Sequence, residues 1–293
     1  MCTSHDSRPP IEPIRGAATD AEMITLKGED GTAFRAYLAR PEQSTGAGVL
    51  ILPDVRGLHP FFEELALRFA ERGMTALAID YFGRTAGAEE RGGGFEHLPH
   101  VDQLRWEEVE GDIKAAVAHL RAVDPAPRSV VAVGFCMGGR FSSLAATMGL
   151  GLAGVIPFYG WPVGKGRAES PAPADLANRI ECDVLSIYGE ADTAIPEDAR
   201  DAFDAALDKA GVKHDTVVYP DAPHGFFDKR AADFADAASD AWDRVLAFIH
   251  RHTAGQPFAA APPVASTPDS GESPSSDPRV THWTGDEAST REG

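Results

Sequence analysis

Two hydrophobic periods alternate along the middle of the chain. Short continuous apolar runs are typical of strands that are buried on both faces of a sheet. Such runs occupy residues 48–52, 75–79, 130–133, 155–159, 184–188 and 216–219, and a hairpin with strands at 23–26 and 34–38 precedes them. Apolar residues spaced three or four apart, which indicate amphipathic helices, occur at 61–70, 103–121, from about 136 and at 234–248. This alternation predicts an α/β fold in one domain, with a mostly parallel central sheet and helices on both faces.

The two ends of the chain lack this pattern. Residues 1–20 hold prolines without apolar periodicity, and we interpret them as a flexible arm. Residues 253–293 are rich in Pro, Ser, Ala and acidic residues, so they can bury too little apolar surface to offset the entropy of ordering. We therefore predict a folded domain over residues 21–252 and a disordered acidic tail over 253–293. Val280 and Trp283 leave open a short docking segment within that tail.

Charge and composition disfavour several kinds of partner. The chain carries 27 Lys and Arg against 45 Asp and Glu, a formal charge of −18. Binding to nucleic acid or to an anionic membrane needs a basic surface, so neither is expected. No apolar run reaches the roughly 20 residues of a membrane helix, and the polar start lacks a signal-peptide core. Three cysteines suit a reducing compartment, so we expect a cytoplasmic monomer or small homo-oligomer that binds a small molecule.

The segment Gly-Phe-Cys-Met-Gly-Gly at 134–139 lies between a buried strand and a helical pattern. In a nucleophile elbow the chain turns sharply from strand to helix, and glycines beside the apex avoid collisions with the backbone. Cys136 at that apex would lie at a helix N-terminus, which favours a thiolate and places backbone N–H groups near an oxyanion. A buried cysteine beside a Gly-rich turn is the alternative.

An acid and a histidine follow two later strands. Asp192 comes just after the strand at 184–188, and His224 just after the strand at 216–219. Taken singly, Asp192 is explained as a helix N-cap and His224 as a surface loop residue. Nucleophile, acid and histidine nevertheless occur in the chain order of the α/β-hydrolases, each after a buried strand. The pattern therefore predicts a catalytic triad of Cys136, His224 and Asp192.

These segments resemble those of the dienelactone hydrolases, or carboxymethylenebutenolidases, which are α/β-hydrolases with a cysteine nucleophile. The resemblance covers roughly residues 20–250 and rests on residues 80–84, 134–139, 189–192 and 222–226. It implies the α/β-hydrolase fold and the cleavage of an ester or lactone through an acyl-enzyme, with no metal or organic cofactor.

The resemblance also implies further site residues. In the family, a carboxylate after the first long buried strand contacts the resting thiol and helps to form the thiolate. Asp54 stands at that position as a shorter replacement for the usual Glu. A loop-capping role for Asp54 is the alternative. Val55 and Met137 would supply the two backbone N–H groups of the oxyanion hole.

The substrate side of the site departs from the family pattern. The family's dienelactone enzymes hold a substrate carboxylate with arginines, one of them shortly after the catalytic histidine, but here Asp228 stands in that place. A carboxylate there would repel an anionic substrate unless a nearby cation compensates. The candidates for that cation are Arg84, which we take as a substrate-binding residue, and Arg56, Arg91, Lys229 and Arg230. Each is otherwise explained as a solvated surface residue.

Aromatic residues are predicted to shape the pocket. Tyr159, Trp161 and Phe226 follow strand ends, where open α/β sheets bind ligands. The glycine run at 92–94 would form either a flexible lid or a plain loop. The pairs His97–His100 and His250–His252 are not completed by a cysteine or an acidic cluster, so no metal site is predicted.

Two other functions fit the same residues. A redox or ligand-binding protein would use Cys136 as an oxidisable thiol on the same scaffold, although it would need neither His224 nor Asp192. An interaction protein would recruit a partner through the acidic tail. Of the three, the joint presence of nucleophile, histidine and acid favours the hydrolase.

Overall fold

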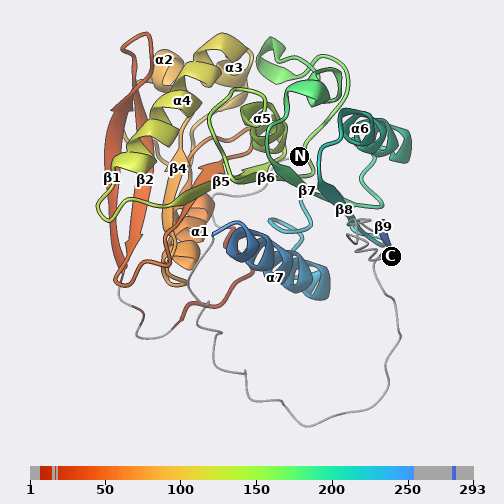
Figure 1. The fold of residues 1–293 in the computed structure, drawn as a ribbon. Coiled ribbons are helices and arrows are strands. Elements are labelled where there is room, and N and C mark those ends of the chain that lie inside the picture. The colour runs from red at the N-terminus through yellow and green to blue at the C-terminus, as the bar shows by residue number, and fades with distance from the viewer. Residues whose placement is uncertain (1–6, 15–16, 18, 254–278, 282–293) are drawn as a thin grey trace, which may run out of the picture.

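The predicted strands form one sheet in the computed structural model, which describes residues 7–14, 17, 19–253 and 279–281 (Figure 1). The strands are β1 Thr19–Lys27, β2 Ala33–Pro41, β3 Ala47–Leu52, β4 Thr75–Ile79, β5 Ser129–Phe135, β6 Gly154–Phe158, β7 Asp183–Gly189, β8 His214–Tyr219 and β9 Arg279–Thr281. They lie side by side in the order β1-β2-β4-β3-β5-β6-β7-β8-β9. The six strands from β4 to β8 in this order run parallel, as the alternating pattern predicted.

The two edges of the sheet are antiparallel. β1 and β2 form the predicted hairpin around Gly28–Gly31, and β2 joins the parallel strands by pairing antiparallel with β4. At the other edge β9 pairs antiparallel with β8. Three residues that we assigned to a disordered tail thus extend the sheet in the structure, and the tail's other residues beyond 253 lie outside the described residues. Val280, which left a docking segment open, is one of the three.

Helices cover both faces of the sheet (Figure 1). The helices are α1 Pro60–Ala70, α2 Gly83–Ala86, α3 Leu98–Val101, α4 Trp106–Ala122, α5 Met137–Ala145, α6 Glu197–Ala210 and α7 Ala235–Arg251, with 3-10 turns at Arg167–Glu169 and Ala174–Arg179. α1 and α7 pack on one face, and α4, α5 and α6 pack on the other. The helical periods in the sequence predicted α1, α4, α5 and α7 but did not include α6, and α2, α3 and the two 3-10 turns are too short to show a helical period.

The hydrophobic core is therefore divided into two layers by the sheet. In β3, Val49 and Ile51 belong to the layer under α1 and α7, while Leu50 and Leu52 belong to the opposite layer. All four side chains are fully buried, which explains why the strand reads as a continuous apolar run. Burial of each such side chain stabilises the fold by about 1.5–3 kcal/mol. No helix in the described part of the chain is long and apolar enough to cross a membrane.

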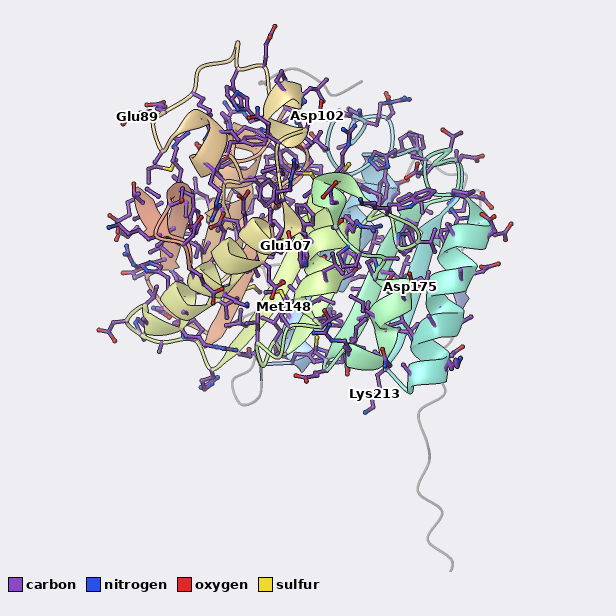
Figure 2. All side chains as sticks on the ribbon, turned by 90° about the horizontal axis from the view of Figure 1, so that it is seen from above. Glu89, Asp102, Glu107, Met148, Asp175 and Lys213 are labelled. Atoms are coloured by element: carbon purple, nitrogen blue, oxygen red, sulfur yellow. The ribbon has the colours of Figure 1, made fainter. Side chains whose placement is uncertain are left out.

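Charged side chains lie on the outside of these layers. Glu89, Asp102 and Lys213 project from the periphery when the molecule is seen from above, and all three are exposed (Figure 2). Charged groups usually lie at the surface in this way, so the buried charged groups discussed below are exceptions that need partners.

Candidate active site

Cys136 lies at the sharp turn between β5 and α5, as predicted. Its backbone has φ 54° and ψ −112°, a conformation that L-residues rarely adopt. The turn is possible because the chain on both sides lacks side chains: a Cβ at Gly134 would overlap the carbonyl of Gly138, and one at Gly138 would overlap the carbonyl of Leu52. The N–H of Cys136 donates to the carbonyl of Phe158, 3.0 Å away, which ties the turn to β6.

His224 and Asp192 meet at the same edge of the sheet. Nδ1 of His224 lies 2.7 Å from Oδ2 of Asp192, whose side chain is fully buried. Oδ1 of Asp192 accepts a hydrogen bond from the N–H of Ala194 at 2.9 Å, which fixes the carboxylate. Asp192 therefore orients an imidazole ring and does not cap α6, the alternative that its position alone had left open.

The imidazole of His224 links Asp192 to Cys136. Burial disfavours the imidazolium, but hydrogen bonds to Asp192 and to Cys136 outweigh this and raise the pKa of His224 to about 10 from its ordinary value of 6.5. The structure thus brings all three predicted triad residues together. A ring held between a carboxylate and a thiol is suited to receive a proton from sulfur and to return it to a leaving group.

A cavity of about 950 Å³ opens over Cys136. This volume lies within the range of small-molecule sites in proteins. Val55 and Met137, our expected oxyanion residues, line it together with Cys136 and His224, and so do Tyr159 and Trp161. The remaining lining residues are His97, Leu98, Arg140, Lys165, Gly166, Arg167, Ala194, Ile195 and Lys229.

One predicted pocket residue, Phe226, does not line this cavity. Its side chain is completely buried and packs against Tyr159 and Tyr219, with ring centroids 6.0 and 5.1 Å apart. Tyr159 in turn packs against His224, with ring centroids 4.9 Å apart. Phe226 therefore supports the cavity wall from behind, because the turn after β8 directs its ring into the core.

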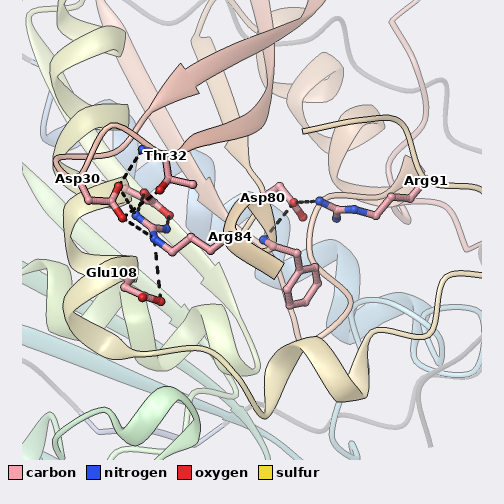
Figure 3. A network of polar contacts seen from close by, with 8 residues as sticks. Asp30, Thr32, Asp80, Arg84, Arg91 and Glu108 are labelled. Atoms are coloured by element: carbon pink, nitrogen blue, oxygen red, sulfur yellow. Dashed lines mark hydrogen bonds and ion pairs between the residues drawn. The ribbon is translucent and has the colours of Figure 1, made fainter. Parts of the chain in front are cut away.

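Arg84, the predicted substrate-binding arginine, also lies outside the cavity lining. Its guanidinium donates to Asp112 at 2.6 and 3.0 Å and to Asp30 at 2.9 and 3.0 Å (Figure 3). Asp112 is completely buried on α4, and burial raises its pKa to about 6 although Arg84 opposes the shift. The carboxylates of Asp30 and Asp112 thus hold Arg84 at the β1–β2 hairpin, where it joins the hairpin to α4.

Arg91, another candidate cation, is also bound by a buried carboxylate. It pairs with the buried carboxylate of Asp80 (Figure 3). Its guanidinium also lies over the rings of Phe82 and Phe95. Asp80 also accepts the N–H of Leu58 at 3.0 Å. The glycine run at 92–94 follows this anchor, and His97 and Leu98 beyond it line the cavity. The Gly-rich segment therefore leads into one wall of the cavity.

Asp54, the predicted thiol-activating residue, is paired with Arg56. The Arg56 guanidinium donates to both carboxylate oxygens at 2.6–3.1 Å, and the N–H of Arg56 donates to Oδ1 at 2.8 Å. Burial disfavours the charged carboxylate, but Arg56 outweighs this and lowers the pKa of Asp54. Asp54 and Cys136 line the same small cavity of about 40 Å³, so the carboxylate lies close to the thiol but is already bound.

Arg56 also contacts the residue that departs from the family pattern. Its guanidinium lies 2.5 Å from Oδ2 of Asp228, four residues beyond the candidate histidine. Burial raises the pKa of Asp228, and Arg56 opposes that shift. The pattern of the sequence marked Arg56 only as one of several candidate cations. Its pairing with Asp228 could not be read from the sequence, because the segment after β3 and the turn after β8 meet only in the folded chain.

Arg140 is a site residue that the sequence analysis missed. It lies one helical turn after Cys136 in α5, and its side chain is almost completely buried. Its five N–H groups donate to Ser170 Oγ and to the carbonyls of residues 161, 163, 164, 170 and 171. Burial, without a carboxylate in contact, lowers the pKa of Arg140 to about 10. The only signal in the sequence was a lone cation in a helix of small and apolar residues.

The histidine pairs do not form metal sites. Nε2 of His252 lies 2.9 Å from Asp183, and His100 stacks on Phe95 with ring centroids 4.8 Å apart. Within the described ranges, no group of three or more His, Cys, Asp or Glu side chains could hold a metal ion.

The chain has a largely parallel sheet between two helical layers. It has a sharp turn with Cys136 after β5, an acid after β7 and a histidine after β8. This arrangement is that of the α/β-hydrolase class. Within that class the chain belongs to the dienelactone hydrolase family, whose model matches residues 34–253. The protein is therefore an ester or lactone hydrolase.

Relatives of similar length agree with this assignment. The chain is 29% identical over 269 residues to a Salmonella typhimurium protein provisionally assigned as a carboxymethylenebutenolidase, an alignment that covers 86% of this chain and 98% of the relative. A Methylorubrum extorquens protein with the same provisional assignment is 30% identical, with 83% and 87% covered. The crystal structure of a Klebsiella pneumoniae protein, provisionally assigned as a dienelactone hydrolase, superimposes with a TM-score of 0.69 at 27% identity and covers 80% of this chain and 99% of that one.

Proposed function

We propose that this protein cleaves a small-molecule ester or lactone by nucleophilic catalysis, with Cys136 as nucleophile, His224 as general base and acid, and Asp192 as the residue that orients His224. The observation that carries the proposal is the position of His224. One side of its ring lies 2.7 Å from the buried Asp192 carboxylate and the ring also hydrogen-bonds Cys136, at the floor of a cavity of about 950 Å³. This is the arrangement that an acyl-transfer site requires.

The reaction would proceed in two steps. With the Cys136 proton held on His224, whose pKa is raised to about 10, the thiolate attacks the carbonyl carbon to form a tetrahedral oxyanion. Collapse of the oxyanion breaks the bond to the alcohol oxygen, which takes the proton from His224 and leaves a thioester on Cys136. A water molecule then gives a proton to His224 and attacks the thioester, and the same proton returns to the Cys136 sulfur as the acid departs.

The oxyanion would be held by the backbone N–H groups of Val55 and Met137. Met137 is the first residue of α5, so its N–H also carries the partial positive charge of the helix N-terminus. In this proposal the thiol proton goes to His224 and not to Asp54, because Arg56 already donates to both carboxylate oxygens of Asp54. Asp54 contributes instead by fixing the segment that carries Val55.

The test compares the wild type with Cys136→Ala on dienelactone and on a neutral p-nitrophenyl ester. We expect Cys136-dependent turnover and, by mass spectrometry after rapid quenching, an acyl group on Cys136. Cys182→Ala is the matched control, because burial raises the pKa of Cys182 to about 12 and it lies at the start of β7, away from the cavity. Peroxide-sensitive Cys136 without an acyl intermediate would contradict the proposal and support the redox alternative.

A further inference from the structure

The charges beside Cys136 indicate what kind of ester the site accepts. We propose that the substrate is neutral and apolar next to the scissile bond, and that Asp228 sets this selectivity by neutralising Arg56. This inference rests on the proposed function and names its substrate class. It goes against the expectation from the family resemblance, in which arginines hold a carboxylate at this place.

Arg56 lines the small cavity beside Cys136, and it is buried between two carboxylates. Only 4% of its side chain is exposed, and it lies 2.6 Å from Asp54 and 2.5 Å from Asp228. Asp54 and Asp228 belong to segments 174 positions apart, after β3 and after β8, so the guanidinium joins the oxyanion segment to the histidine segment. A guanidinium with a carboxylate on either side offers little attraction to a third one.

The small cavity beside Cys136 is balanced in charge as a whole. The charged residues that line it, besides the candidate triad, are Asp54 and Asp228 against Arg56 and Lys229. A substrate carboxylate placed there would lose its hydration without meeting a net positive charge, which is costly in a buried site. An apolar group at the same place would lose nothing comparable.

The other arginines near the site are bound by other groups of the protein. All N–H groups of Arg140 donate to oxygens of the 161–171 segment, although its side chain lines the large cavity. Arg84 is held by Asp30 and Asp112, and Arg91 is held by Asp80. None of the three can turn toward a substrate without leaving a buried partner unsatisfied.

The mouth of the cavity differs from its floor. Lys165 and Arg167 also line it, but 69% and 54% of their side chains are exposed and they pair with Glu169 and Asp102. A negative charge far from the reacting bond would therefore remain hydrated near cations at the mouth. The lining of the cavity also includes the apolar side chains of Leu98, Trp161 and Ile195. The site thus selects against charge at the reacting carbonyl and tolerates charge at the distal end.

The experiment uses two lactones that differ only in charge: dienelactone, which carries a carboxylate, and its carboxamide, which keeps the ring and the scissile bond. We expect the wild type to show a kcat/KM for the carboxamide that exceeds that for the acid by about tenfold or more. Asp228→Asn removes one of the two carboxylates around Arg56, so we expect it to shift this ratio by about tenfold toward the acid. Asp233→Asn is the matched control, because Asp233 is exposed and pairs with Arg230 outside the cavity.

A second measurement separates this inference from the proposed function. Dienelactone and its carboxamide are titrated against Cys136→Ala, which in the proposed mechanism cannot turn them over. The signal is the fluorescence of Trp161, which lines the cavity, and the control is Cys136→Ala with Trp161→Phe. Tighter binding of the amide, reversed by Asp228→Asn, supports the inference even if lactone turnover is absent. A wild-type preference for the acid, or a ratio that Asp228→Asn and Asp233→Asn change equally, would overturn it and leave Cys136 catalysis intact.

Discussion

Nδ1 of His224 lies 2.7 Å from Oδ2 of Asp192, although 32 residues separate them in the chain. The contact forms because β7 and β8 are adjacent parallel strands, so the turns that follow them reach the same edge of the sheet. Asp192 is buried and His224 is only partly exposed, which makes the carboxylate a strong local determinant of the state of the ring.

Asp192→Asn is expected to lower kcat/KM by about 10²–10⁴-fold at neutral pH, because an amide neither stabilises the imidazolium nor holds the productive tautomer. The pKa of His224 should also fall from about 10 toward its ordinary value of 6.5. The pH dependence of kcat/KM and an NMR titration of the histidine together check this. An unchanged pH profile would exclude Asp192 as the partner that controls His224.

The raised pKa of His224 also predicts how stability depends on pH. Because the pKa in the folded state is about 10 and the ordinary value is 6.5, the folded protein retains a proton that the unfolded chain loses. The resulting stabilisation is fully present below pH 6.5 and is lost as the pH rises through about 10. The difference in Tm between wild type and His224→Gln should therefore be largest near pH 6.5 and should become smaller as the pH rises to about 10. A difference that grows with pH would contradict the assignment.

Gly138→Ala tests the elbow itself. The added methyl group would overlap the carbonyl oxygens of Leu52 and Pro53, which belong to rigid backbone. We expect a loss of about 2–4 kcal/mol in the free energy of unfolding, with a distorted Cys136 and reduced activity. Gly111→Ala in α4 is the control, because its Cβ would lie 3.5 Å from Glu29 and it favours the helix by about 0.5–1 kcal/mol. Chemical denaturation of both variants measures the contrast.

The main features of the fold were predictable from the sequence because each buried strand is a continuous apolar run with turn residues beside it. The positions of Cys136, Asp192 and His224 could be inferred for the same reason, since all three follow such runs. The placement of Arg84 was wrong because a local pattern cannot show that Asp112, on a later helix, binds its guanidinium. The prediction that Phe226 lines the pocket was wrong, because hydrophobic periodicity does not show in which direction a ring points after a strand ends.

Contacts between distant segments likewise could not be predicted from the sequence. The bridge from Asp54 through Arg56 to Asp228 joins two loops that meet only when the sheet has formed. The pairing of β9 with β8 places residues 279–281 on the sheet although their surroundings in the sequence are polar and Pro-rich. In both cases the determining partner lies far away in the chain, and single-sequence periodicity carries no information about it.

Arg84→Met is expected to leave kcat/KM for every tested ester within about twofold, because Arg84 is bound at the hairpin (Figure 3) and is not among the residues that line the cavity. The substitution should instead lower the free energy of unfolding by about 2–3 kcal/mol, since it removes the partner of the buried Asp112. Steady-state kinetics and urea denaturation measure the two effects. A selective rise in KM for anionic substrates would contradict this prediction and show that Arg84 binds the substrate. Arg105→Met, which removes hydrogen bonds only to backbone carbonyls at the start of α4, is the control.

Arg140→Met should loosen one wall of the cavity. The guanidinium holds the 161–171 segment through carbonyl groups, and a Cβ at Gly166 would collide with it, so the segment and the side chain are closely fitted. Without Arg140 several buried carbonyls lose their donor, and we expect a loss of about 3 kcal/mol or more in the free energy of unfolding.

The kinetic consequence of Arg140→Met depends on substrate size. Trp161, Gly166 and Arg167 form the wall that Arg140 fixes, so a bulky ester that reaches this wall should show a KM raised by about tenfold, whereas a p-nitrophenyl acetate that contacts only the floor should not. The rate of Cys136 alkylation by iodoacetamide should also change little, because the sulfur itself does not contact the wall. Arg140→Lys provides the conservative comparison: its single ammonium can reach only part of the carbonyl set, so its KM should lie between those of wild type and Arg140→Met. Equal losses on the small and the bulky ester would show that Arg140 acts through the stability of α5 and not through the cavity wall.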